Sequence, residues 1–270
     1  VQEDLGKDDT PDYLSISFSS TDYVGHMFGP SSLESEDNLL RLDQTLSDLF
    51  AFVDQQVGLD QTLIVLSADH GAAETPAQLN GFGIDARVFE PDGLDTSQAI
   101  EALKARFGIA DELVSGFDHP YLYLDRQVLT AHELDMAEVA RAVAAELTSF
   151  EGVAYAVPSI DLVEGKMPDT RLYRQILRNF NPKRSGDIYL VLEPQWFVAE
   201  FDGLTVTSTH GSPWRYDTFV PIIFAGGGLK SRTVFEEVET VDIALTLAKY
   251  LRIKEPSGST GRPLIEVLNP

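Results

Sequence analysis

The sequence has 270 residues, of which 43% are hydrophobic and 23% charged, as is usual for a globular protein. Its 43 acidic and 20 basic side chains give a net charge of −23, which argues against nucleic acid or an anionic membrane as a partner. Cysteine is absent, so disulfides and thiolate metal sites are excluded, and any zinc ion must be held by histidine and carboxylate ligands.

The first third of the sequence predicts a strand, a helix and a second strand. Apolar residues alternate over Tyr13–Phe18, which predicts a strand. Segment Glu36–Val57 places its apolar residues on one helical face, and Gly58 supplies a C-terminal stop. Segment Thr62–Ser67 is a continuous apolar run, typical of a strand buried on both faces. This order predicts a parallel sheet with a helical crossover.

The middle of the sequence has a different character. Segments Ser97–Phe107 and Met136–Phe150 have helical patterns, whereas Tyr121–Leu124 and Val153–Val157 resemble short strands. We therefore expect residues 84–182 to form a smaller α/β insertion or cap.

Strands of the core type return near the C-terminus. Segments Asp187–Leu192 and Val220–Phe224 are predicted strands, and Val241–Leu251 is a predicted helix. The expected fold is α/β, with a mainly parallel central sheet flanked by helices. Its core is expected to comprise residues 1–83 and 183–270.

Five candidate metal ligands fall in three short motifs. Asp22 and His26 follow the first predicted strand, Asp69 and His70 follow the second, and His210 lies in a third motif. Open α/β sheets place their sites at the carboxyl ends of strands, where the first two motifs are expected. Carboxylate and imidazole together are a normal ligand set for zinc.

The sequences of these motifs resemble those of a known family. Three similar metal motifs occur in the threonine-nucleophile branch of the alkaline phosphatase superfamily. This branch includes PafA-type alkaline phosphatases and nucleotide pyrophosphatases/phosphodiesterases. The resembling segments are PDYLSISFSSTDYVGHMFGP, LIVLSADHG and STHGSPWRYDTFVPIIFAG. RSGDIYLVLEPQW is closer to the PafA-type members, and VDIALTLAKYLRI with TGRPL resembles the family's C-terminal helix and tail.

The resemblance implies a site with two Zn²⁺ ions. By motif position, Asp22, His26 and His210 would hold one ion, while Asp69 and His70 would supply part of the other site. The family's remaining Asp ligand and its Thr or Ser nucleophile come from a segment upstream of this region. That upstream N-terminal segment is expected to be missing here, and Thr21 does not occupy the nucleophile's position.

The activity implied by the resemblance is hydrolysis of small phosphate monoesters through a phospho-threonine intermediate. Phosphodiesterase or nucleotide pyrophosphatase activity is the alternative, and a non-catalytic zinc-binding fragment is another. The family implies a periplasmic or extracellular location, although no signal peptide pattern opens the sequence. No apolar run approaches the roughly 18 residues of a membrane span. Cobalt or copper could also occupy such ligands in vitro.

Four further residues have weaker sequence signals of a role in binding. Trp214 and Arg215 follow the His210 motif, where they could line a substrate pocket or simply pack over the site. Lys183 and Arg184 could bind an anion, although an exposed loop is the simpler interpretation.

The two remaining histidines and one aspartate receive structural interpretations. His119 and His132 lie in the predicted insertion without a matching carboxylate, so we expect satisfied or exposed side chains. Asp187 precedes a strand, and we expect it to fix a turn rather than to bind metal.

Overall fold

The computed structural model describes residues 4–201 and 203–268. They form two compact units. Of the described residues, unit 1 contains 4–23, 33–71 and 219–268, and unit 2 contains 24–32, 72–201 and 203–218. The predicted insertion over residues 84–182 falls entirely within unit 2, which extends beyond it on both sides. Each unit is described by itself below.

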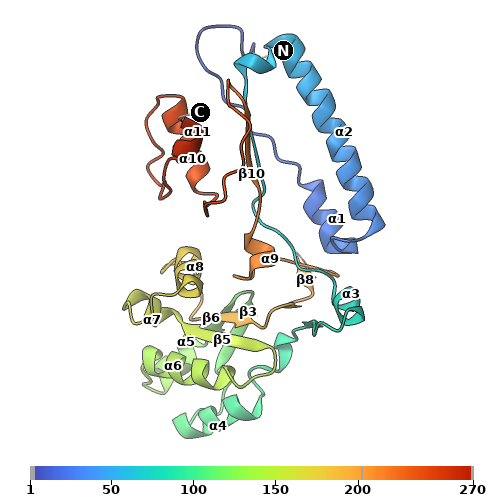
Figure 1. The fold of residues 1–270 in the computed structure, drawn as a ribbon. Coiled ribbons are helices and arrows are strands. Elements are labelled where there is room, and N and C mark those ends of the chain that lie inside the picture. Colours follow the sequence, from blue (N-terminus) through green and yellow to red (C-terminus); the bar gives the residue numbers. More distant parts are fainter. Residues whose placement is uncertain (1–3, 202, 269–270) are drawn as a thin grey trace. The chain divides into compact units, whose positions relative to one another are not determined.

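Unit 2 contains most of the secondary structure (Figure 1). Its elements are α3 (Pro76–Gly81), β2 (Arg87–Val88), a 3₁₀ turn (Pro91–Gly93), α4 (Gln98–Phe107), β3 (Val114–Asp118), β4 (Tyr121–Leu124), α5 (Arg126–Ala131), α6 (Met136–Leu147), β5 (Val153–Pro158), α7 (Ser159–Val163), α8 (Arg171–Asn179), β6 (Ile188–Leu192), β7 (Trp196–Phe197), β8 (Glu200–Phe201), β9 (Leu204–Thr205) and α9 (Arg215–Thr218).

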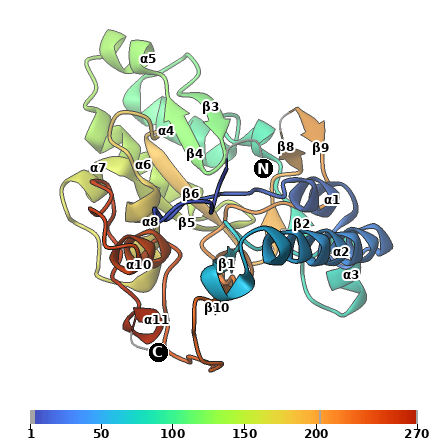
Figure 2. The ribbon, with the colours of Figure 1, turned by 90° about the horizontal axis from the view of Figure 1, so that it is seen from above.

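A four-stranded antiparallel sheet, in the order β3-β4-β6-β5, is the centre of unit 2 (Figures 1 and 2). Every residue of β6 is buried, and its side chains alternate between the two faces. Ile188, Leu190 and Leu192 pack in a cluster with residues of α4, α5 and α6. Tyr189 and Val191 belong to a second cluster with residues of α7 and α8. Unit 2 is therefore a sheet covered by helices on both faces.

Local signals explain where the helices of unit 2 begin and end. The Ser97 side chain accepts a hydrogen bond from the Ile100 amide and caps α4. Gly108, with φ of 71°, ends α4 in the left-handed conformation that glycine adopts without strain. Asp135 caps α6 by accepting from the Glu138 amide.

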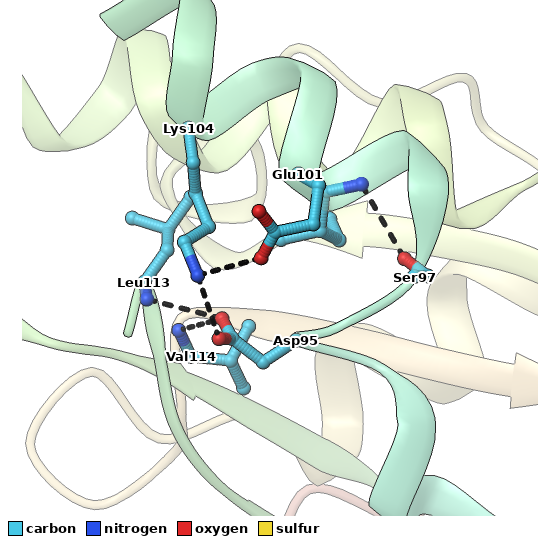
Figure 3. Close-up of polar contacts among 7 residues, drawn as sticks. Asp95, Ser97, Glu101, Lys104, Leu113 and Val114 are labelled. Atoms are coloured by element: carbon cyan, nitrogen blue, oxygen red, sulfur yellow. Dashed lines mark hydrogen bonds and ion pairs between the residues drawn. The ribbon is translucent and has the colours of Figure 1, made fainter. Parts of the chain in front are cut away.

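A buried ion pair joins α4 to the start of β3 (Figure 3). The Lys104 ammonium donates to Asp95 at 3.3 Å and to Glu101 at 2.8 Å. Asp95 also accepts from the backbone amides of Leu113 at 3.0 Å and Val114 at 2.8 Å. Hydrogen bonding to Glu101 first, and then to Asp95, raises the Lys104 pKa. This network satisfies the polar groups of a lysine that the fold buries.

Unit 1 has fewer elements. They are α2 (Leu33–Gln56), a 3₁₀ turn (Leu59–Gln61), β1 (Leu63–Ser67), β10 (Ile222–Gly226), α10 (Asp242–Tyr250) and α11 (Ile265–Leu268). Glu34 and Glu36 lie in the first turn of α2, where negative charge stabilises a helix. Helix α1 (Ser20–Phe28) begins in unit 1 and ends in unit 2.

Most predicted elements are present, with ends within three residues of the expected ones, but three expectations were wrong. Tyr13–Phe18 is not a strand, because no described strand pairs with it. The run Thr62–Ser67 does form β1, but it is only partly buried, since its one partner is β10. The β1–β10 pair is antiparallel, and β2–β7 is the one parallel pair among the described strands. The α/β class is correct, whereas a mainly parallel sheet is not formed by these strands.

Unit 1 buries few of its apolar side chains. Among the described residues its buried hydrophobic side chains are Leu245, Ala248 and Leu264. On α2, by contrast, Leu33 is 79% exposed and Leu40 is 65% exposed. The apolar face that the α2 sequence predicts is therefore present but largely uncovered. Within the described part of the chain, no helix combines the length and hydrophobicity needed to cross a bilayer.

Candidate metal centre

Helix α1 carries the first two predicted ligands. Asp22 and His26 are four residues apart, which is about one turn of an α-helix, so they lie on the same face. We expected both residues to follow a strand, whereas the structure places them on this helix. Asp22 lies in its first turn, where a carboxylate is favoured by the helix dipole.

The backbone of unit 2 holds His26 in one tautomer. His26 is 3% exposed, and its Nδ1 lies 2.8 Å from the Ser208 carbonyl oxygen. A carbonyl oxygen only accepts hydrogen bonds, so Nδ1 carries the proton. The Nε2 lone pair then remains available for a metal ion, as in metal sites whose histidines donate their other N–H to a carbonyl group.

The third predicted ligand, His210, lies next to His26 in unit 2. The two ring centroids are 5.0 Å apart, with 44° between the ring planes. Segment 207–209 is tied down on both sides. Thr207 donates from its amide to the His26 carbonyl at 2.9 Å, and Ala73 donates to the Thr209 carbonyl at 3.2 Å. These bonds bring together histidines that are far apart in sequence.

Asp22, His26 and His210 form a group that could hold a metal ion. One ligand atom from each lies within 4.8 Å of the other two. The position of Asp22 relative to His26 follows from their shared helix, and His26 and His210 lie within one unit. One carboxylate and two imidazoles are a known zinc donor set, and with its fixed tautomer His26 offers Nε2 as a ligand. The residues present therefore fit a zinc ion.

Asp69 and His70 follow β1 in unit 1. The His70 Nδ1 lies 2.9 Å from the Gly71 carbonyl oxygen, so Nε2 is again the nitrogen left for a metal. This Nε2 lies 3.6 Å from an Asp69 oxygen and 3.9 Å from an Asp22 oxygen. The Asp69 side chain is 88% exposed. Among the described residues, these two do not belong to a group of three ligands at the spacing of the Asp22 group.

A small pocket in unit 2 lies beside His210. It is lined by 15 residues of that unit, and its volume of about 10 Å³ is about that of one water molecule. His119, Thr209 and Gly211 are among the lining residues. Gly211 has a φ of 107°, a conformation that side chains disfavour, and it lies against the His119 ring.

His119 is the lining residue that sequence reasoning undervalued. Burial lowers its pKa to about 4, so its imidazole is neutral at pH 7. Its buried Nδ1 has no hydrogen-bond partner among the described residues. We had expected a satisfied or exposed side chain, and this expectation was wrong, because His119 is neither exposed nor fully satisfied. No sequence signal pointed to this position, because His119 and Gly211 are brought together by tertiary packing.

Hydrogen bonds to Asp217 order the loop after His210. Asp217 is 4% exposed and accepts from the Ser212 amide at 2.9 Å and from the Ser212 hydroxyl. The Ser212 oxygen in turn accepts from the Trp214 amide at 3.3 Å. The motif analysis did not single out Asp217, although it lies only seven residues beyond His210.

The residues with weaker sequence signals are not among the three candidate ligands. The Trp214 indole donates to the Leu192 carbonyl at 2.9 Å, and Arg215 begins α9. Neither is among the residues that line the pocket beside His210. His132 lies 4.0 Å from Asp111, a residue outside the candidate site. Asp187 accepts from the Leu124 amide and from Arg126, which is the structural role we predicted.

Comparison with known proteins identifies the family. The profile of the family described as type I phosphodiesterase / nucleotide pyrophosphatase matches residues 2–213. The chain belongs to this family. Membership confirms the resemblance that the motifs indicated.

Curated relatives extend the likeness over nearly the whole chain. A protein named calcium-transporting ATPase from Myroides odoratus is 37% identical over 257 residues, which are 95% of this chain and 46% of that protein. The alkaline phosphatase PafA of Elizabethkingia meningoseptica is 35% identical over 265 residues, which are 98% of this chain and 47% of PafA. The chain thus spans about half the length of these relatives.

Solved structures of the family have the same fold. The crystal structure of PafA superimposes with a TM-score of 0.84 and 34% identity, covering 97% of this chain and 49% of PafA. Human ectonucleotide pyrophosphatase/phosphodiesterase 5 gives a TM-score of 0.61 over 92% of this chain, at 15% identity, which supports the fold alone. Both likenesses agree with the α/β phosphatase-like fold that the sequence predicted.

Proposed function

We propose that this chain is the metal-binding part of a zinc-dependent phosphate-ester hydrolase that cleaves small phosphate monoesters. The convergence of Asp22, His26 and His210 carries the proposal, because three donors of the zinc-binding type lie within 4.8 Å of one another. Homology to an alkaline phosphatase at 35% identity supports the choice of reaction.

The five predicted ligands would divide between two Zn²⁺ ions. Asp22, His26 and His210 would hold one ion, while Asp69 and His70 would supply part of the second site. When bound, such ions lower the pKa of an attacking oxygen and neutralise charge on the leaving oxygen. The Ser208 and Gly71 carbonyls would hold His26 and His70 with Nε2 available for coordination.

The nucleophile is expected to come from a segment outside these 270 residues. Because the chain spans about half the length of its relatives, a Thr or Ser and a further Asp ligand could be supplied by that segment. We propose a phospho-threonine intermediate in the complete protein. This is a double displacement in which the threonine oxygen attacks phosphorus, the alcohol leaves, and water later cleaves the phospho-enzyme.

Two other functions compete with this one. A phosphodiesterase or nucleotide pyrophosphatase is the nearer alternative, since the matching family carries that description. A non-catalytic zinc-binding fragment is the second, because no nucleophile is assigned within the sequence. The family resemblance favours a periplasmic or extracellular location for the complete protein.

Zinc stoichiometry tests the ligand assignment. The purified 270-residue chain would be incubated with excess zinc, dialysed and measured by elemental mass spectrometry. About one ion per chain is expected from the complete three-ligand group. His26→Ala should abolish this binding, whereas the matched control His132→Ala, a histidine outside the group, should retain it. Absence of zinc from the unaltered chain, or equal loss in both variants, would refute the assignment.

Activity of the full-length protein separates the competing functions. An alkyl phosphate and a phosphate diester would be compared as substrates at equal concentration. Faster cleavage of the monoester is expected, and faster cleavage of the diester would establish the alternative. Asp22→Ala should abolish either reaction, and full activity in this variant would remove Asp22 from the catalytic site.

A further inference from the structure

A short basic segment stands out in this acidic chain. Residues 166–184 contain one acidic side chain, Asp169, whereas the whole chain has 43 acidic and 20 basic ones. The segment holds six of those 20 basic side chains: Lys166, Arg171, Arg174, Arg178, Lys183 and Arg184. Charges further apart than the Debye length of about 8 Å are largely screened at physiological salt. Lys166 pairs with Glu164, just outside the segment, at 2.5 Å, and the remaining side chains leave the segment with a net positive charge.

Helix α8 presents three of these charges on one face. Arg171, Arg174 and Arg178 are spaced at i, i+3 and i+7, and all three are exposed. The opposite face carries Ile176, which is fully buried, and Tyr173, which packs in the same cluster. Burial of this apolar face fixes the direction of the arginines. Arg171 and Arg178 are about 10 Å apart along the helix axis.

The turn after α8 adds two more positive charges. Asn181 orders this turn, because its side-chain oxygen accepts from the Lys183 backbone amide at 3.0 Å and its own backbone amide donates to the Ser185 hydroxyl at 2.9 Å. The side chains of Lys183 and Arg184 remain exposed. Sequence reasoning had considered these two as anion ligands and preferred a plain loop. Their position directly after the basic face of α8 supports the first interpretation.

The basic charge is only partly neutralised within the segment. Arg174 pairs with Asp169, and Arg171 and Arg178 each have an interaction of their own. An exposed pair such as Arg174–Asp169 contributes only about 0–1 kcal/mol, so a multiply charged anion can displace it. A ligand with one charge gains too little to do so.

Helix α8 and the His210 pocket share a wall of unit 2. Ile176 packs in one hydrophobic cluster with Tyr189 and Val191. Tyr189 and Val191 also line the pocket beside His210. The basic face is thus held on the same compact unit as two of the predicted zinc ligands, His26 and His210.

We infer that the basic face of α8 and the turn over residues 181–185 bind phosphate compounds that carry several phosphoryl groups. That these compounds are substrates, and not only ligands, rests on the proposed hydrolase function. The predicted metal site would take one phosphoryl group, while the basic surface would hold others. Arginine suits this role because its guanidinium binds phosphate oxygens in pairs.

Binding of inorganic tripolyphosphate to the chain tests the inference without any catalysis. Calorimetry would be run with excess chelator, so that zinc sites contribute nothing. We expect binding that weakens by about tenfold between about 20 and 200 mM salt. The triple variant R171Q/R174Q/R178Q should bind at least about tenfold more weakly, and orthophosphate should bind far less well than tripolyphosphate.

A matched control removes the same charge elsewhere. Arg41, Arg106 and Arg232 are exposed and lie outside the segment, so R41Q/R106Q/R232Q lowers the net charge equally. This control should bind tripolyphosphate like the unaltered chain. Equal weakening in both triple variants would refute the inference, and so would binding that is unaffected by R171Q/R174Q/R178Q. Tryptophan fluorescence would check that each variant is folded.

Two further results would overturn the inference while leaving the proposed function intact. Strong binding of phosphatidylglycerol vesicles that competes with tripolyphosphate and is lost in R171Q/R174Q/R178Q would identify a membrane surface as the ligand instead. Equal orthophosphate and tripolyphosphate affinity would reduce the surface to a simple anion site. Conversely, loss of zinc binding with tripolyphosphate binding retained would refute the hydrolase proposal alone.

Discussion

The Asp95 network offers a quantitative test of what holds unit 2 together. Asp95→Ala removes the acceptor for the Leu113 and Val114 amides and one of the two partners of Lys104. Each hydrogen bond to a charged group contributes about 1.5–3 kcal/mol. Lys104 keeps its bond to Glu101, so losing the Lys104–Asp95 bond adds little to this cost. We therefore expect the free energy of unfolding to fall by about 3–6 kcal/mol.

Asp95→Asn separates the backbone bonds from the ion pair. The asparagine oxygen can still accept from both amides, while the charge opposite Lys104 is lost. The expected cost is about 1 kcal/mol, because the Glu101 partner remains. The difference between the two variants measures the two backbone bonds.

Urea denaturation followed by tryptophan fluorescence is the appropriate assay. The chain has two tryptophans, Trp196 and Trp214, and both lie in unit 2, so the signal reports this unit. With a slope of about 2 kcal/mol per molar urea, Asp95→Ala should lower the midpoint by about 1.5–3 M. Equal losses in the alanine and asparagine variants would refute the reasoning, since the ion pair would then outweigh the backbone bonds.

Three other outcomes are expected. Because burial lowers the His119 pKa to about 4, below its unfolded value of about 6.5, unit 2 is fully stabilised above pH 6.5. It should lose up to about 3 kcal/mol as pH falls from 6.5 to 4, and metal-free His119→Phe should lose less over that range in urea titrations. Gly211→Ala should weaken zinc binding about tenfold by straining the His210 backbone, whereas Gly83→Ala, also at positive φ but in open space, should not. In the 270-residue chain, Leu40→Lys should reduce aggregation measured by light scattering, with unit 2 fluorescence unchanged, because Leu40 is 65% exposed; increased aggregation would contradict this.

Local sequence patterns were enough to predict the helices and strands that are stabilised by their own caps and apolar faces. The α4 and α6 helices and the β4 and β6 strands lie within three residues of their predicted ends. The strand prediction for Tyr13–Phe18 was wrong because a strand forms only with a hydrogen-bonded neighbour, and the described part of the chain provides none for this segment. The antiparallel β1–β10 pair was missed because alternation within one strand does not specify the direction of its partner.

The candidate site was predictable in composition but not in arrangement. All five ligands were named from short motifs, and their roles remain predictions. That Asp22 and His26 share a helix face was missed, because a four-residue spacing fits a helix or a loop equally. The His119 contact with Gly211 joins positions 92 residues apart, and no local pattern encodes such a contact.

The contact between His26 and Ser208 has a consequence for mutagenesis. The atom that fixes the His26 tautomer is a main-chain carbonyl, which every amino acid supplies. The Ser208 hydroxyl makes a separate bond to the Ala73 carbonyl. Substitutions at position 208 would therefore show the effect of losing the hydroxyl group, but they would leave the carbonyl group that holds His26 in place. Replacing the amide between residues 208 and 209 with an ester, which makes that carbonyl a poorer acceptor, would reveal it.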